Sequence, residues 1–441
     1  MLSVWLLTTV PVGAAVHVWD GGGTDNRWLT AANWVGDVAP VAGDTLAFPA
    51  EAVQLSSVNN FPAYIAFGSL LISNNYHFSG NPLALNSGIT VFGTANGPRV
   101  AIFDMPIRLT APQTFRVSSE GEGATSGLKF LAEIDTQGLE LTLDPSGTTD
   151  KIEIGDFSQA GGFTGAGDIK KTGRGDLWLT AEESTHSGVI HIMQGTVLAT
   201  HGTVFGSNDA GTIVESGAEL LLDMVHGSYV VDEPLTLSGK LAGASYIVWA
   251  GAIHLPAGMA QIGSTASPFM ITGEISGPGG ISVSPSGPFY SERGTLPNTY
   301  QGLTDVHGFA VINAIQPQSD VVFAGYYLSG SGSLGRVTAT GLRSKTLAPG
   351  DGIGGTLSTR GLALNNQTRV EFNLNPAASN SIHVAGRVDL ANAQLRFWGF
   401  PSSNPNQHYT LISNDGTDPV IGTFADLPEG ALVTSNLPPG L

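Results

Sequence analysis

The sequence contains no cysteine and few charged residues. Only 12% of its 441 residues are Asp, Glu, Lys or Arg, which is about half of the usual ~25%. Without cysteine the chain has no disulfide framework, thiolate metal site, cysteine nucleophile or iron–sulfur cluster. A low charge together with 41% hydrophobic residues also argues against a wholly disordered chain, because disorder requires low hydrophobicity and high charge.

Positive charge and long apolar runs are scarce as well. The chain has 18 Lys and Arg against 36 Asp and Glu, so its formal net charge is −18. Such a charge disfavours general binding to nucleic acid or to an anionic membrane surface. No apolar run reaches the ~20 residues that a membrane-spanning helix needs. We therefore expect no nucleic-acid partner and no transmembrane segment.

Residues 1–15 resemble a secretory signal peptide. The stretch MLSVWLLTTVPVGAA is apolar, and it ends with Gly13 and Ala15 where a signal peptidase requires small residues. Its positive region is only the terminal amine, because no Lys or Arg precedes Arg27. The alternative is an apolar first strand of the mature protein. We predict a signal peptide at 1–15 and a secreted, extracellular or cell-surface location.

Helical periodicity is also lacking, and the pattern that is present indicates strands. Short runs of alternating apolar residues, such as PLTLSG at 234–239 and RVDLANAQLRF at 387–397, are separated by Gly, Asn, Asp, Ser or Pro. Val, Ile, Thr, Phe, Tyr and Leu at period two are typical of strands buried on one face. Glycine is abundant, with 59 residues, and it supplies the positive φ that tight corners need. The pattern predicts an all-β chain of many short strands.

Two glycine-rich blocks repeat along the chain. The first reads GAGDIKKTGRGDLWL from 165, and the second reads GPGGISVSPSGPFYS from 277. The matching pairs are Gly165 with Gly277, Gly167 with Gly279, Ile169 with Ile281, Gly175 with Gly287, and Leu177 with Phe289. Each block continues through a polar loop to a further glycine and strand, and a reduced third start lies at 328–337. Such a unit buries its apolar face only by stacking on a similar neighbour, so the blocks predict a β-solenoid with coils of roughly 20–25 residues.

The first block resembles the autotransporter-associated β-strand repeat, also called the passenger-associated transport repeat. That repeat reads roughly G-x-G-x-L-x-K-x-G-x-G-x-L-x-L, followed by a loop with N-x-Y-x-G and a further glycine. The matching residues here are Gly165, Gly167, Ile169, Lys171, Gly173, Gly175, Leu177, Leu179, Gly188, Ile190, Ile192, Gly195 and Val197. The second block has Val283 at the lysine position and prolines in its strands, but it keeps Asn298, Tyr300 and Gly302 of the loop.

This resemblance implies a secreted or surface protein with a right-handed parallel β-helix, and it implies no single activity. We therefore expect one elongated all-β domain after the signal peptide. Its parts are N-terminal coils with a Trp-rich cap at 16–164, two passenger-type repeats at 165–327, and C-terminal coils at 328–441. In similar chains the last stretch leads into closing strands, so we expect this chain to be short at its C-terminus.

Motifs of catalysis and cofactor binding are lacking. The chain has no Asp-Asp pair, polygalacturonase-like signature, Gly-x-Ser-x-Gly elbow, His-Glu-x-x-His motif or Walker loop. We therefore predict a protein that is not an enzyme, with no catalytic residue, no cofactor and no metal site. Carboxylates can still meet across stacked coils, which leaves a polysaccharide lyase or hydrolase as the alternative.

Two further groups of polar residues have alternative interpretations. A metal site at the closest histidines would involve His186, His191 and His201, whose spacing does not fit a helical zinc pair. Calcium binding by turn oxygens would involve Asp20, Asp25 and Asn26, or Asp144, Asp150 and Asp156. We favour surface histidines and solvated turn carboxylates.

Three tryptophans near the start, Trp19, Trp28 and Trp34, suggest either a cap on the solenoid core or a sugar-stacking platform. We expect the cap. The function that we expect is structural or adhesive, with self-association into fibres or a surface layer, or binding to cell-surface or matrix components. A glycan-binding surface protein is the remaining alternative.

Overall fold

The computed structural model describes residues 14–93, 99–119, 126–157, 161–223, 228–244, 246–265, 267–292, 294, 296–350, 354–399 and 407–433. Residues 1–13, on which most of the signal-peptide prediction falls, lie outside this set. The helical elements of the described residues are two short 3₁₀ turns, η1 (Ala31–Asn33) and η2 (Gly202–Phe205). No helix among these residues is long and apolar enough to cross a membrane.

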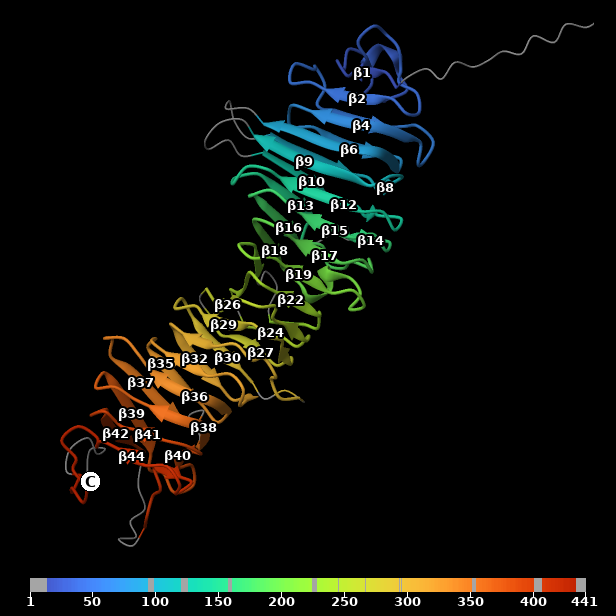
Figure 1. The fold of residues 1–441 in the computed structure, drawn as a ribbon. Coiled ribbons are helices and arrows are strands. Elements are labelled where there is room, and N and C mark those ends of the chain that lie inside the picture. The colour runs from blue at the N-terminus through green and yellow to red at the C-terminus, as the bar shows by residue number, and fades with distance from the viewer. Residues whose placement is uncertain are drawn as a thin grey trace, which may run out of the picture. The chain divides into compact units, whose positions relative to one another are not determined.

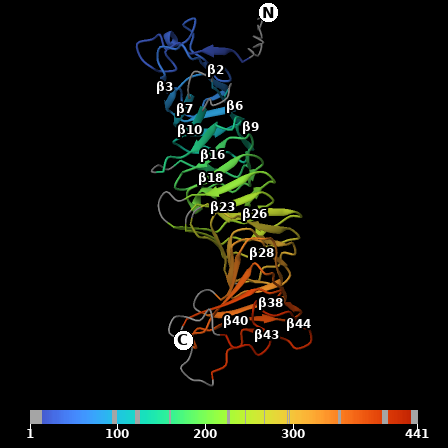
Figure 2. The same cartoon turned by 90° about the vertical axis from the view of Figure 1, so that its left-hand side faces the viewer.

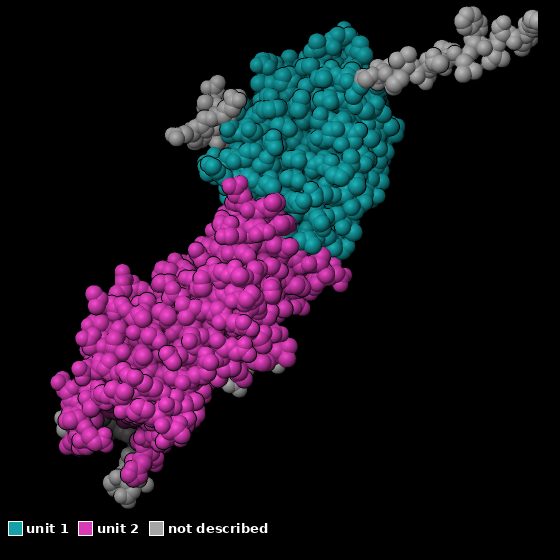
Figure 3. All heavy atoms as spheres, in the orientation of Figure 1, with its two compact units in different colours: residues 1–190 teal, residues 191–441 magenta. Residues whose placement is uncertain are grey.

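The chain divides into two compact units, residues 1–190 and residues 191–441 (Figure 3). Strand β17 (Ile190–Ile192) contains the boundary. Every pairing between named strands of the described residues is parallel, and successive partners come from successive coils of the chain (Figure 1). Both units are therefore parallel β-solenoids, and the predicted all-β solenoid fold is confirmed.

Unit 1 consists of two long sheets and one short one. The first long sheet contains β1 (Val16–Val18), β2 (Thr45–Phe48), β4 (Ala66–Ile72), β6 (Leu83–Gly93), β9 (Gln113–Ser119), β12 (Leu141–Pro145) and β15 (Ile169–Lys171). The second contains β3 (Ser56–Asn59), β5 (His77–Gly80), β7 (Arg99–Asp104), β10 (Ser126–Phe130), β13 (Lys151–Ile154) and β16 (Asp176–Leu179). The short sheet joins β6 to β8 (Ile107–Leu109), β11 (Ile134–Asp135) and β14 (Phe163–Thr164).

Unit 2 has three sheets. The first contains β19 (Thr212–Val214), β22 (Leu235–Leu237), β25 (Ile253–His254) and β28 (Ile275–Ser276). The second contains β18 (Thr196–Ala199), β20 (Glu219–Leu222), β23 (Lys240–Gly243), β26 (Met259–Ser264), β29 (Gly280–Val283), β31 (Thr304–Val306), β33 (Ile315–Gln316), β34 (Val321–Phe323), β36 (Ser333–Ala339), β38 (Gly355–Ala363), β40 (Asn380–Val384), β41 (Val388–Asp389), β43 (Ile412–Asn414) and β44 (Val420–Ile421). The third contains β21 (Tyr229–Val231), β24 (Ile247–Trp249), β27 (Phe269–Ile271), β30 (Pro288–Ser291), β32 (Phe309–Ile312), β35 (Tyr327–Gly330), β37 (Lys345–Pro349), β39 (Thr368–Asn373) and β42 (Gln394–Trp398).

The strands bury every second side chain, as their alternating sequences predict. In β2 and β16 burial alternates residue by residue. The buried positions stack along each unit into ladders of Leu, Ile, Val and Phe, while the alternate positions form the outer faces of the sheets. In Figure 2 strands β7, β10 and β16 follow one another along one face of unit 1.

Coil length differs more than the sequence predicts. In unit 1, Gln113 faces Leu141 and Leu141 faces Ile169, so these two coils take 28 residues each, whereas Leu70 faces Ile89 after only 19 residues. In unit 2, Leu235 faces Ile253, so that coil takes 18 residues. The expected 20–25 residues fall between these values, because strand alternation sets the length of each edge but not the length of the corner loops.

Candidate functional site

The three N-terminal tryptophans are fully buried. Each has 0% of its side chain exposed, and each indole N–H has an acceptor. Trp19 donates to the Gln54 carbonyl (2.9 Å), and Trp28 donates to the Ser57 hydroxyl (3.0 Å). Trp34 donates to the Trp28 carbonyl (2.7 Å). None of the three presents a ring face to solvent, so the sugar-platform alternative is wrong for this cluster.

The tryptophans close the apolar core of unit 1. Their rings contact Phe48, which lies 4.7 Å from Phe78 between ring centroids. From there the rings of Phe78, Phe103 and Phe130 stack along the coils, with centroid separations of 4.6 and 5.4 Å. Trp19, Trp28 and Trp34 thus occupy the place of a cap at the end of an aromatic ladder.

The edge of strand β1 beside this cap is covered. The Val35 N–H donates to the Val18 carbonyl (2.8 Å), and Trp34 forms a bridge with Trp19. The His17 ring lies 3.2 Å from the Val38 carbonyl. A covered edge offers few free backbone groups for strand addition by another chain.

The repeat-defining glycines are corners and close backbone contacts. Gly165 and Gly277 both have positive φ, 85° and 107°. A Cβ at Gly188 would overlap the backbone of Gly167 on the preceding coil. In the second copy a Cβ at Gly302 would overlap Gly279, to which the Gly302 N–H donates (3.0 Å).

The other repeat-defining residues also have structural positions. The apolar members of the set face inward and are buried: Ile169, Leu177, Leu179 and Ile281. Left-handed corners are Gly173 and Gly195. Close contacts with a neighbouring coil are made by Gly175 and Gly287.

Lys171, at the lysine position of the repeat, is buried and serves its own turn. Its ammonium donates to the carbonyls of Thr172 (2.7 Å) and Gly173 (3.0 Å). Burial lowers the pKa of Lys171 to about 8, and the nearby carboxylates of Asp176 and Asp144 partly oppose that shift. The charge thus satisfies corner carbonyls that a shorter side chain could not reach.

Tyr300 of the loop signature is the centre of a buried polar network. Its hydroxyl lies 2.5 Å from the Thr304 hydroxyl and accepts from the Gln316 amide (2.7 Å). Thr304 and Ser319 are joined hydroxyl to hydroxyl (2.7 Å). Asn298 accepts from the Ile275 N–H (2.9 Å). Sequence reasoning found Asn298 and Tyr300 but missed their partners, because Ile275 lies on the preceding coil and Gln316 on the following one.

The histidines and turn carboxylates are dispersed. Among the described residues no group of three His, Asp or Glu side chains is placed to hold a metal ion. His191 pairs with Glu215 (2.8 Å), whereas His186 is 0% exposed, so the expectation of a surface histidine is wrong for His186. Asp25 accepts from the Thr30 hydroxyl (3.0 Å), and Asp150 accepts from the Gly147 N–H (2.8 Å). Asp25 thus stabilises its own turn. Asp150 is only 1% exposed and also accepts from the Ser119 N–H on the preceding coil (3.3 Å), so the expectation of a solvated carboxylate is wrong for Asp150.

A groove of about 470 Å³ lies on the outer face of β7, β10, β13 and β16 in unit 1. We call it the Trp178 groove; its lining is Val100, Ser126, Gly127, Leu128, Lys129, Thr149, Lys151, Glu153, Asp176 and Trp178. In the strand register Gly127 faces Lys151, and Glu153 faces both Lys129 and Trp178. Four successive coils thus supply one continuous surface.

The polar groups of the Trp178 groove are held in fixed positions. Glu153 accepts from Lys129 (3.0 Å) and from Lys151 (2.8 Å), and it is only 5% exposed. The Lys151 ammonium lies 3.9 Å from the centroid of the partly exposed Trp178 ring. Cation–π contact of this kind restrains both side chains. Two lysines and two carboxylates, Glu153 and Asp176, line the groove, so the lining residues carry no net charge; Asp156, which lies beside the lining, also contacts Lys129 (3.6 Å).

Gly127 makes the hollow of the groove. It stands in a row of outward positions between Val100 and Lys151, and it has no side chain to fill its place. A Cβ there would meet the Lys151 carbonyl at 3.5 Å and Val100 at 3.6 Å, which is ordinary contact. The sequence alone did not indicate this groove, because its residues are spread over four strands that only the cross-coil register brings together.

No family model, curated protein or solved structure matches the chain. A function therefore has to be inferred from the fold and from the groove.

Proposed function

We propose that the protein is a non-enzymatic, secreted or cell-surface β-solenoid with a structural and adhesive role, and that the Trp178 groove binds a neutral saccharide. The observation that carries this proposal is the groove itself. It combines a partly exposed indole ring, an apolar floor and fixed polar lining residues of zero net charge. An uncharged sugar ring has the same combination, with apolar faces and a polar edge.

The arrangement of outer charges supports a non-enzymatic role. Ion pairs join neighbouring coils, as in Arg116 with Asp144 (2.8 Å) in unit 1 and Lys240 with Glu219 (2.7 Å) in unit 2. In the strand registers of the described residues of each unit, no carboxylate faces another carboxylate. Glycoside hydrolysis commonly uses two carboxyl groups about 5–9.5 Å apart. Glu153 and Asp156 do lie near each other, but both contact the Lys129 ammonium (3.0 and 3.6 Å), which occupies the space between them. Asp144 and Glu219 likewise have a basic partner, and such neutralised carboxylates suit a passive surface.

Binding to a glycan array by the full chain and by a Trp178→Ala variant is the decisive experiment. We expect the wild type to bind neutral glycans and the variant to lose at least tenfold in affinity. Trp398→Ala is the matched control, because Trp398 is more exposed than Trp178 and lies in unit 2, outside the groove. Gly127→Ala, which narrows the groove without steric conflict, should weaken binding as well. Equal binding by wild type and Trp178→Ala, or no neutral ligand at all, would overturn the proposed site.

The non-enzymatic part has its own readout. Glycans that bind are incubated with the protein, and new reducing ends and unsaturated products are measured. We expect none. Release of either product at a rate above that of buffer would overturn the structural and adhesive role in favour of a lyase or hydrolase.

Export is proposed from the resemblance of residues 1–15 to a signal peptide and of 165–197 to the passenger-associated transport repeat. The full gene is expressed in a secreting host, and the N-terminus of the released protein is read by mass spectrometry. We expect release from the cell with Val16 as the first residue. Retention inside the cell with residues 1–15 still attached would contradict the export proposal.

Self-association is the last part of the proposal. A strand edge whose backbone groups are free can pair with a strand of another copy. The edge of β1 is covered, so we propose that self-association uses other strand edges. Sedimentation velocity over a hundredfold concentration range, with electron microscopy of the same samples, measures this directly. We expect species larger than the monomer at high concentration. A strictly monomeric protein over the whole range would remove self-association from the proposal.

A further inference from the structure

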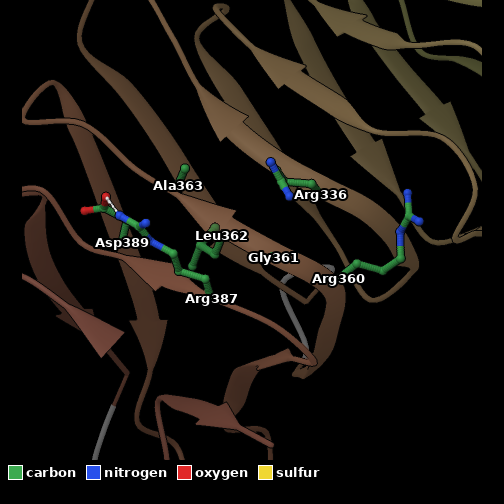
Figure 4. Close-up of a pocket in the computed structure, with 7 residues that line it drawn as sticks. All are labelled: Arg336, Arg360, Gly361, Leu362, Ala363, Arg387 and Asp389. Atoms are coloured by element: carbon green, nitrogen blue, oxygen red, sulfur yellow. Dashed lines mark hydrogen bonds and ion pairs between the residues drawn. The ribbon is translucent and has the colours of Figure 1, made fainter. Parts of the chain in front are cut away.

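A second groove lies in unit 2 and has a different charge. It has a volume of about 320 Å³ and lies on the outer face of β36 and β38, beside the turn that precedes β41 (Figure 4). Three of its seven lining residues are arginines, Arg336, Arg360 and Arg387. Lysine and arginine together make up only 18 of 441 residues, so three guanidinium groups around one small hollow are a marked concentration of positive charge.

Two of the three arginines are already paired. Arg360 binds the Asp320 carboxylate (2.8 Å), and Arg387 binds Asp389 (3.1 Å). Figure 4 shows the Arg387–Asp389 contact on one side of the groove and the Arg360 side chain directed away from it on the other. These two pairs hold the rim of the groove in place but leave no excess charge of their own.

Arg336 supplies the excess charge. Its backbone N–H donates to Asp320 (2.8 Å), but its guanidinium has no hydrogen bond or ion pair within the described part of the chain. Five N–H donors of a planar, permanently charged group therefore face the groove without an acceptor from the protein. With three arginines and two aspartates the groove carries one net positive charge.

Gly361 opens the space in front of this guanidinium. It faces Arg336 in the strand register. A Cβ at Gly361 would lie 3.6 Å from Arg336 Cγ and Nε and 3.6 Å from the Arg387 carbonyl oxygen. The missing side chain thus leaves a hollow between Arg336 and Arg387, with Leu362 and Ala363 beside it (Figure 4).

The geometry points to a binding site for the carboxylate of an acidic saccharide, with Arg336 as its principal ligand. A guanidinium matches a carboxylate with two parallel N–H···O bonds, and the apolar surface of Ala363 lies where the sugar ring would rest. The chain as a whole carries −18, but charges more than about 8 Å away are screened at physiological ionic strength. The local guanidinium therefore decides whether an anion binds.

Titration calorimetry of the full chain with trigalacturonate at pH 7, starting at physiological ionic strength (about 0.15 M NaCl), where distant charges are screened, tests this site. We expect saturable binding that weakens as NaCl rises and that falls at least tenfold in Arg336→Gln. Arg116→Gln is the matched control, since it removes the same charge from an exposed outer position in unit 1 and should leave binding unchanged. Gly361→Ala narrows the hollow at ordinary contact distances and should weaken binding without changing the melting temperature.

Parallel titrations distinguish binding at this groove from binding at the Trp178 groove. Neutral trigalactose and inorganic sulfate are titrated in parallel. Equal binding of trigalacturonate by wild type and Arg336→Gln, or no binding by the wild type, would overturn the site. Sulfate binding as tight as that of trigalacturonate would overturn its assignment to a saccharide carboxylate. Trp178→Ala should bind trigalacturonate as the wild type does, because the two sites lie in different units.

Discussion

His186 occupies in the first repeat the position that Tyr300 occupies in the second. The His186 N–H donates to the Phe163 carbonyl (3.1 Å), and the Tyr300 N–H donates to the Ile275 carbonyl (3.3 Å). Both side chains are 0% exposed. The same buried place is therefore filled once by a phenol with hydrogen-bonding partners and once by an imidazole whose ring nitrogens have no partner among the described residues.

The position two residues earlier is also equivalent. The Ser184 hydroxyl accepts from the Phe163 N–H (3.2 Å), as Asn298 accepts from the Ile275 N–H (2.9 Å). Ser184 and His186 thus replace the Asn and Tyr of the loop signature that the first repeat lacks in sequence. Sequence comparison missed this because the second loop is two residues longer and because neither replacement is chemically similar.

Replacing His186 with leucine should stabilise unit 1. Neither ring nitrogen has a hydrogen-bonding partner among the described residues, and a buried unsatisfied group costs about 1–3 kcal/mol. Burial lowers the pKa of His186 to about 4 from an ordinary 6.5. The folded protein favours the neutral ring, so this ring contributes its whole stabilising effect above pH 6.5, the ordinary pKa of histidine. That contribution is lost as the pH falls through about 4, the pKa of His186 in the folded protein.

Thermal midpoints of wild type and His186→Leu at pH 7 and pH 4 measure this effect. We expect the variant to have a higher melting temperature than the wild type at both pH values. Between pH 7 and pH 4 its free energy of unfolding should fall less than that of the wild type, by on the order of 2–3 kcal/mol. His383→Leu, at an exposed histidine, is the control. An equal acid loss in wild type and His186→Leu would contradict the prediction.

Tyr300→Phe should destabilise unit 2 by about 1–2 kcal/mol, because the Gln316 amide and the Thr304 hydroxyl lose a buried partner. Urea unfolding at pH 7 measures the change. Tyr246→Phe, at an exposed tyrosine, should have no effect. Identical urea midpoints for Tyr300→Phe and wild type would show that the hydroxyl network contributes nothing net.

Glu233→Gln should stabilise unit 2 above neutral pH. Glu233 is 2% exposed; one oxygen accepts from the Thr212 hydroxyl (2.8 Å), and the other has no partner among the described residues. Burial raises its pKa to about 7, with Asp232 adding to the shift and the Thr212 bond opposing it. The protonated Glu233 side chain therefore contributes its whole stabilising effect below pH 4.5, the ordinary pKa of glutamate. That contribution is lost as the pH rises through about 7, the pKa of Glu233 in the folded protein.

Melting curves at pH 4.5 and pH 8 test the sign of this dependence. The wild type should lose on the order of 2–3 kcal/mol at Glu233 over that range, and Glu233→Gln should lose none of it. Glu429→Gln, at an exposed residue, should follow the wild type. A parallel fall in Glu233→Gln and wild type would place the titrating group elsewhere.

Gly302→Ala should destabilise unit 2 by about 1–3 kcal/mol, because its Cβ overlaps the Gly279 backbone and neither backbone segment can move freely. Gly361→Ala is matched to it, since the added Cβ there meets its neighbours at 3.6 Å. The midpoint of urea unfolding should fall only for Gly302→Ala. Comparable midpoints for the two variants would mean that the close approach of coils at Gly302 is not required.

The fold was predictable because it depends on local signals. Alternating strands and glycine corners such as Gly165 and Gly277 are visible in the sequence, and the need to stack follows from their one apolar face. The two grooves were not predictable in this way. Glu153 meets Lys129 and Trp178 only after the coil lengths have set the register, and corner loops of variable length hide that register from the sequence.

Gly127 and Gly361 show how little is needed to change the outer surface of such a protein. Each is a glycine in a row of outward-facing strand residues, and its missing side chain leaves a hollow on the surface. The residues on the neighbouring coils determine the charge and polarity of that hollow. The buried ladders of apolar side chains do not determine the charge or polarity of these hollows. A single substitution at such an outward position can therefore create, alter or remove a binding site on a solenoid. The buried side chains that determine the fold do not change.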